Sequence, residues 1–175
     1  MKLNYSWCVC ALSAAMAVVP ATAATLHNSA EVLMKDAGAK AFNISDNAQA
    51  IFLSEPESNI SWQGQAMRLE AIKNAVQQIS GDVGHLNLWG EMESPAERKA
   101  VEEANPLLKD LAAQTSDAIR FLNDNTNHLF LPEYRQHLQK IAQDANQLRA
   151  LFRESTKLNS LSRKAEHLRE ELSHS

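Results

Sequence analysis

The sequence has 175 residues, of which 17 are basic and 21 acidic, and its formal net charge is −4 at pH 7. Charges of both signs are interspersed along this mildly acidic chain, which argues against the basic face that a nucleic-acid-binding protein needs. Cys8 and Cys10 are the only cysteines, so a chain that loses its first residues has no disulfide, cysteine-ligated metal or covalent c-type haem.

The N-terminus has the pattern of a secretory signal. Lys2 gives a positive start, an apolar run follows from Trp7 to Val19, and Ala21-Thr22-Ala23 offers the small residues that a signal peptidase reads. This run is shorter than the roughly 20 apolar residues of a membrane-spanning helix. We expect residues 1–23 to be removed as a signal peptide. Residues 24–175 should then form a single domain, periplasmic or secreted, with no membrane insertion.

Apolar residues in the rest of the chain recur at helical spacing, and the alternation typical of β-strands is absent from the sequence. The first helix should begin near Asn28 or Ser29, either of which can act as N-cap while Glu31 reaches back to the backbone. It should end before Pro56, because a proline disfavours helix in the preceding residue. Its expected inward residues are Leu33, Ala37, Ala41, Ile44, Ala48 and Ile51.

The second helix, expected from about Ser61 to Leu88, carries the most regular heptad pattern of the chain. Its expected core positions are Trp62, Leu69, Val76 and Val83, with Gln65, Ile72, Ile79 and Leu86.

The third helix has a strong start signal, with Ser94 as N-cap, Pro95 at the first helical position and Glu97 completing a capping box. Pro106 should kink this helix near Asn105 without ending it. The expected inward residues are Val101, Ala104, Leu108, Leu111, Thr115, Ala118 and Leu122.

The fourth helix should begin at about Pro132 and change phase after residue 157. Its first part places Leu138, Ile141, Ala145, Leu148 and Phe152 inward. Beyond it, the apolar positions move back by one residue, to Leu158, Leu161, Ala165, Leu168 and Leu172. Either one long helix drifts in phase, or a short fifth helix follows a break.

These segments predict an all-α fold, an antiparallel up-down four-helix bundle with or without a short fifth C-terminal helix. The rival arrangement is a pair of helical hairpins completed by a second chain, so both a monomer and a homodimer are compatible with the pattern.

Three stretches, "ISWQGQAMRLEAIKNAV", "SPAERKAVEEANPLLKDLAAQTSDAIRFLNDN" and "PEYRQHL", resemble segments of small exported bacterial helical proteins of unknown function. The resemblance implies a bacterial, periplasmic setting and a helical bundle. It implies no activity and no site residues.

A haem or metal carrier is the sharpest alternative function. Met34 and His167 lie where four-helix b-type cytochromes place their axial ligands, but Met34 falls beside the expected seam and His167 lies in a charged run. A di-metal bundle needs two Glu-x-x-His units, and only Glu171 to His174 has that spacing, while Asp82 and His85 flank the second seam. We therefore expect no cofactor and no metal.

No nucleophile elbow or Ser-His-Asp arrangement is visible in the sequence, so we expect a protein that is not an enzyme. Trp62, Trp89 and residues 128–132 either close the ends of the bundle or form an apolar patch that recognises a protein partner. The expected function is that of an exported, non-catalytic interaction or envelope-stress protein with an unknown protein partner. The alternative is a haem- or metal-binding four-helix carrier.

Overall fold

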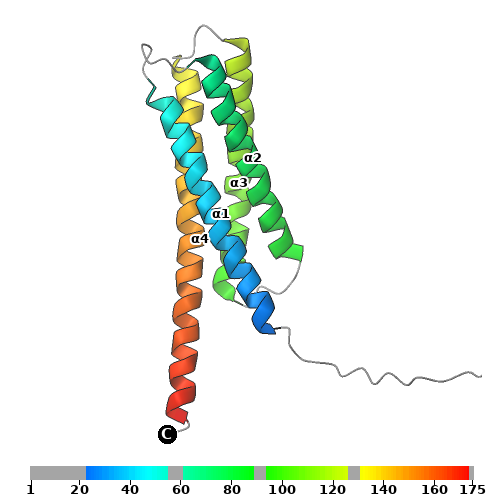
Figure 1. The fold of residues 1–175 in the computed structure, drawn as a ribbon, viewed down its shortest axis with the longest axis vertical. Helices are drawn as coiled ribbons and strands as arrows, with labels where there is room; N and C mark the ends of the chain where they lie inside the picture. The colour runs from blue at the N-terminus through cyan, green and yellow to red at the C-terminus, as the bar shows by residue number, and fades with distance from the viewer. Residues whose placement is uncertain (1–22, 55–60, 89–93, 126–130, 174–175) are drawn as a thin grey trace, which may run out of the picture.

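The chain folds into four long helices that lie alongside one another (Figure 1). The computed structural model describes residues 23–54, 61–88, 94–125 and 131–173. The helices are α1 (Ala23–Phe52), α2 (Trp62–Leu88), α3 (Pro95–Asp124) and α4 (Pro132–Ser173). Each helix contacts the next one along the chain, and α4 also packs against α1. The predicted all-α fold is confirmed.

Contacts between neighbouring helices show that they run in opposite directions. Between α1 and α2, Lys40 Nζ lies 2.8 Å from Asp82 Oδ2, and Arg68 donates to Asn47 at 2.9 Å, so residue numbers rise on one helix as they fall on the other. Between α3 and α4, the ring of Phe121 stacks on Tyr134 with a centroid distance of 5.3 Å. The bundle is therefore up-down-up-down, as predicted.

The heptad stripes of the four helices meet in one hydrophobic core. In α2, every apolar position of the predicted seam from Leu69 to Leu86 is buried, because the stripe faces the bundle axis. The seams of α3 and α4 are buried as predicted, from Val101 to Leu122 and from Leu138 to Phe152. Several of these buried positions hold small residues, among them Ala104, Thr115 and Ala118 of α3.

The helix boundaries confirm one start signal and correct another. Ser94 caps α3, since its Oγ accepts from the Ala96 amide at 3.1 Å, and Pro95 is the first helical residue. Pro106 lies inside α3, which continues to Asp124. By contrast, α1 begins at Ala23, so Asn28 and Ser29 lie inside the helix and are not its cap. The alanines at the start of α1 have the highest helix propensity, which favours this earlier start.

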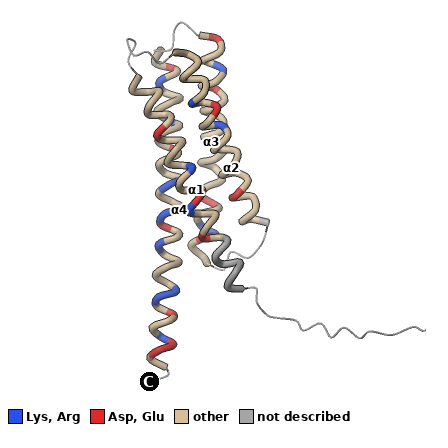
Figure 2. The backbone as a smooth tube through the Cα atoms, viewed as in Figure 1, with Lys and Arg blue, Asp and Glu red and all other residues tan. Residues whose placement is uncertain are grey.

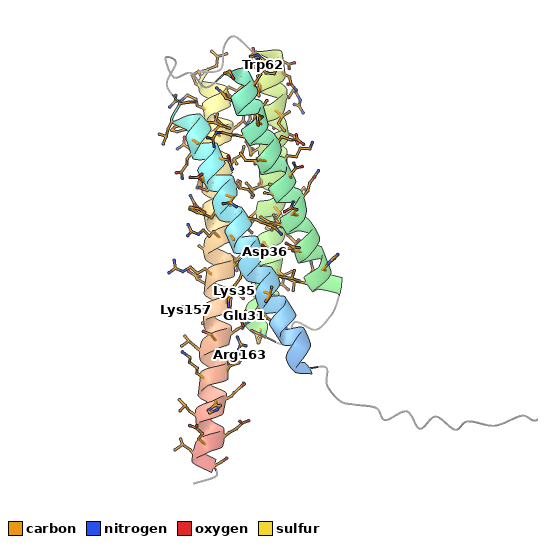
Figure 3. The ribbon with its side chains drawn as sticks, viewed as in Figure 1. Glu31, Lys35, Asp36, Trp62, Lys157 and Arg163 are labelled. Carbon is orange, nitrogen blue, oxygen red and sulfur yellow. The ribbon has the colours of Figure 1, made fainter. Side chains whose placement is uncertain are left out.

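Two residues lie elsewhere than the sequence pattern predicts. Met34, expected beside the seam, is fully buried, whereas Leu33 is half-buried at the edge of the core. Trp62, expected at a core position, is 44% exposed because it is the first residue of α2, at one end of the bundle (Figure 3). Gln65, one turn later, is the first α2 side chain that the bundle buries.

The fourth helix continues without a break to Ser173, so the expected phase change takes place within one helix and there is no separate fifth helix in this stretch. At 42 residues, α4 is about 63 Å long, whereas the other three helices have 27 to 30 residues and span about 40 to 45 Å. Its last turns therefore project beyond the bundle (Figure 1). Within the described ranges, no helix combines the length and the hydrophobicity that a membrane crossing requires.

Replacing Ile79 by aspartate should unfold the bundle. Ile79 is fully buried, so the new carboxylate would lie among apolar side chains, at a penalty of about 4 kcal/mol or more. Circular dichroism during thermal unfolding measures this loss. The matched control is Gln78→Asp, one residue away and exposed, which should keep the cooperative transition. Equal melting temperatures for the two variants would contradict the assignment of this face to the core.

Candidate interaction surface

The last turns of α4 extend beyond the first turn of α3. Asn159 of α4 lies opposite that turn, where its Nδ2 donates to Glu97 Oε1 at 2.5 Å. One turn further, Arg163 pairs with Glu31 of α1 (Figure 3). Nearly all side chains from Leu161 to Ser173 are exposed. We call residues 160–173, a segment of about 21 Å, the C-terminal extension.

Five apolar residues run along one side of α4 and its extension at alternating steps of three and four. We call them the leucine face: Leu158, Leu161, Ala165, Leu168 and Leu172. The four leucines are 56%, 50%, 59% and 78% exposed, in chain order. In heptad notation, Leu158, Ala165 and Leu172 occupy position a, and Leu161 and Leu168 occupy position d. This is the spacing at which a second helix can bury every residue of the stripe.

Other large exposed apolar residues do not form such a stripe. Val32, Met67 and Leu53 lie singly on α1, on α2 and just after α1, as scattered surface residues do in most proteins. Two exposed or half-exposed aromatic rings are covered by arginines of α4, since the guanidinium of Arg149 lies 4.5 Å from the centroid of Phe42 and that of Arg135 lies 4.4 Å from the centroid of Phe52.

A shallow groove lies between α1 and α4, next to the ring of Phe42. It has a volume of about 370 Å³, with Gly38 and Phe152 among the residues that line it and Phe42 and Arg149 on its walls. Gly38 has no side chain, so it adds no side-chain atoms to the floor of this groove. Since Arg149 already stacks on Phe42, part of the apolar surface of the groove has a partner within the chain.

A layer of buried polar groups marks the point where the core ends. The Ser94 hydroxyl donates to Asn159 Oδ1, and the Asn159 amide donates to Glu97, whose side chain is fully buried. We call Ser94, Glu97 and Asn159 the polar layer. It corrects the predicted capping box, because Glu97 turns inward to α4 and not back to the backbone of Ser94. These bonds fix the rotation of α4 against α3, and so fix the direction in which the leucine face points.

The pairing of Glu31 holds the start of the C-terminal extension against α1. Lys35 Nζ lies 2.6 Å from Glu31 Oε1, and Arg163 contacts the other oxygen. Hydrogen bonds from Lys35 and then Arg163 lower the pKa of Glu31 below its usual value of 4.5, against the opposing effect of partial burial.

The candidate haem ligands lie far apart. Met34 is buried, and its Sδ accepts from the Ser155 hydroxyl at 3.5 Å. His167 is 71% exposed on the C-terminal extension, where its Nδ1 lies 3.4 Å from Glu171 Oε1. The structure therefore does not bring the proposed ligand pair together.

The remaining candidates do not assemble into a site in the part of the chain that the structure describes. Asp82 binds Lys40 at 2.8 Å. The two fully buried carboxylates of the described ranges lie far apart: Glu97 of α3 binds Asn159, and Asp144 of α4 binds Lys140 within the same helix. Asn159 and Lys140 are about 28 Å apart along α4. No group of three or more His, Cys, Asp or Glu in the described ranges could hold a metal ion. His174, Trp89 and residues 128–130 lie outside these ranges.

Comparison with protein-family models, curated proteins and solved structures found no match to this chain. The resemblance to small exported bacterial helical proteins therefore stays a prediction, and the fold and surfaces of this chain carry the functional argument.

The heptad spacing could have revealed the polar layer from the sequence. Counting back from Val101 by four places Glu97 on the α3 seam, and counting on from Phe152 by seven places Asn159 on the α4 seam. These positions were missed because they are polar and the expected stripe followed apolar residues only.

Replacing Asn159 by alanine should destabilise the bundle by about 2 kcal/mol, because the buried Glu97 carboxyl loses its hydrogen-bond donor. Urea unfolding followed by circular dichroism measures the change in the free energy of unfolding. Asn146→Ala, at an exposed position of the same helix, is the control and should have little effect. If both variants had the same stability, the polar layer would not contribute as described.

Acidification should remove the stabilisation that Glu31 provides. Because its pKa is lower in the folded chain, Glu31 stabilises the fold above pH 4.5, and this contribution disappears as the pH falls through the folded pKa. The difference in unfolding free energy between the natural chain and Glu31→Gln should therefore shrink below pH 4.5. Urea unfolding from pH 3 to 7 measures it, and about 1 M salt should reduce the difference at pH 7. A difference that stayed constant or grew on acidification would contradict this pairing.

Proposed function

We propose that this chain is an exported, non-catalytic interaction module that binds a protein partner through the leucine face. The exposure of four leucines at coiled-coil spacing on a projecting helix is the observation that carries this proposal. Burying each leucine against a partner would contribute about 1.5 to 3 kcal/mol, so the stripe offers a large gain on association.

The marginal stability of an isolated helix supports the same proposal. A helical segment of about 14 residues without tertiary contacts is close to its limit of stability in water. Beyond Arg163, the side chains of the extension are exposed, and their ion pairs, such as His167 with Glu171, lie within the helix itself. A partner helix on the leucine face would supply the missing tertiary packing.

The N-terminal sequence supports export as the setting for this interaction. Lys2, the apolar run from Trp7 to Val19 and the small residues before Ala24 form the pattern of a cleavable signal. We therefore place the proposed interaction in the periplasm or outside the cell.

Site-specific cross-linking tests the proposed binding surface. A photoreactive amino acid at Ser162, which borders the leucine face, should form an adduct heavier than the monomer in the cells that naturally produce the protein. Replacing Leu161 and Leu168 by aspartate in the same chain should abolish the adduct, because two charges would then face the partner. Gel analysis and mass spectrometry of the adduct measure both results.

The control places the photoreactive amino acid at Met67, which is 76% exposed on α2, and should give no comparable adduct. The aspartate variant should keep the thermal transition of the bundle, since both leucines lie outside the core. The absence of an adduct from Ser162, or its persistence in the aspartate variant, would contradict the proposed function.

A further inference from the structure

We infer that the partner of the leucine face is a second copy of this chain, and that the two copies associate with their C-terminal extensions antiparallel. This inference rests on the proposed function and names the partner of that same surface. It follows from the sizes of the side chains in the stripe, the charges beside it and the position of the bundle behind it.

The sizes of the side chains favour an antiparallel pair. In antiparallel coiled coils, a residue at position a packs against a residue at position d of the other helix. Leu158 would then face Leu168 of the second copy, and Leu161 would face Ala165 of the second copy. In these contacts each leucine meets a leucine or an alanine. Leu172 would lie opposite Glu154 of the second copy and is outside the matched part of the stripe. A parallel pair in register would place Ala165 against its own counterpart and leave a void at the centre of the stripe.

The charges that flank the stripe favour the same direction. In the antiparallel pair, Lys157 lies beside Glu171 of the second copy, and two-fold symmetry repeats this attraction on the other side. The two copies of Lys164 would also lie beside each other, and this single repulsion opposes the two attractions. In a parallel pair, Lys164 would instead lie beside Arg169 of the second copy, and two-fold symmetry would give two such repulsive contacts.

The position of the bundle leaves room for such a pair. Arg163, which contacts α1, occupies heptad position f, on the side of α4 opposite to the leucine face. The first turn of α3 lies beside Asn159, and beyond it α1 contacts α4 at Arg163, on the side away from the leucines (Figures 1 and 3). Opposite helix directions would therefore place the two bundles at opposite ends of the shared helix pair.

Figure 2 shows that basic and acidic residues are mixed along this part of α4, without a block of one sign.

Analytical ultracentrifugation of the purified, processed chain tests self-association. The chain should sediment as a concentration-dependent, elongated dimer. Leu168→Ala removes two leucines from the two-fold interface and should raise the dissociation constant by about 100-fold or more. Met67→Ala, at an exposed position outside the interface, should leave it unchanged. A monomer at every concentration would overturn the inference, as would a dimer that Leu168→Ala leaves intact.

Charge reversal tests the direction of the helices. Glu171→Lys and Lys157→Glu should each weaken the dimer by about tenfold, and the double variant should restore it because the attraction returns with reversed signs. Glu170→Lys makes the same charge change at position f and is the control. A parallel pair has no contact between Lys157 and Glu171, so a double variant that fails to restore the dimer would overturn the antiparallel arrangement.

The cross-linking experiment at Ser162 separates this inference from the proposed function. If the purified chain is monomeric but Ser162 forms an adduct with a different protein, the dimer is overturned and the proposed function stands. If the purified chain is monomeric and Ser162 forms no adduct, both are wrong.

Discussion

The burial of four apolar stripes against one another is the constraint on which the rest of the structure depends. No cysteine lies in the described ranges, so these helices are held by side-chain burial and by a few polar contacts between neighbours. Each helix presents residues at steps of three and four toward the bundle axis, and only the antiparallel arrangement with short links buries all four stripes in chain order. The length of the bundle is set by its shorter helices. Anything that α4 carries beyond them is left at the surface.

At the polar layer, the apolar stripe of α4 stops being buried in the core. Ser155 and Asn159 take over the inward positions that apolar residues hold earlier in the helix, and Glu97 of α3 accepts a hydrogen bond from Asn159. A buried polar contact contributes little net free energy compared with an apolar one, but it tolerates few alternative geometries. It therefore orients the last turns of the helix, and the leucine face consequently points away from α1 and the core.

The fold was largely predictable from the sequence because its signals are local and repeated. The seam of α2 from Leu69 to Leu86, the cap at Ser94 and the inward residues of α4 all follow from periodicity and helix-start chemistry. The choice between Leu33 and Met34 was not predictable, since both are apolar neighbours and the packing against α4 decides which one is buried. Glu97 has two competing roles at one position, and only the approach of Asn159 selects between them.

The sequence predicts the spacing of the leucine face but not its exposure. The change of phase from Leu158 onward was apparent, but whether those leucines face the core depends on where α3 begins relative to α4. That is a property of three-dimensional packing and not of local pattern. With Ser94 opposite Asn159, α3 does not reach beyond that point, and α1 contacts α4 there through Arg163, so the described part of the chain leaves the stripe exposed. An internal seam of the usual kind thus becomes an external one, and this is the surface that we propose to bind a partner.

The central claim is that association through the leucines stabilises residues 160–173 of α4. Amide hydrogen exchange across this segment is the most direct test. If the claim is correct, protection of these amides rises steeply with protein concentration, while protection of the α2 core around Val76 stays constant. Rapid exchange of residues 160–173 at every concentration, beside a fully protected core, would contradict it.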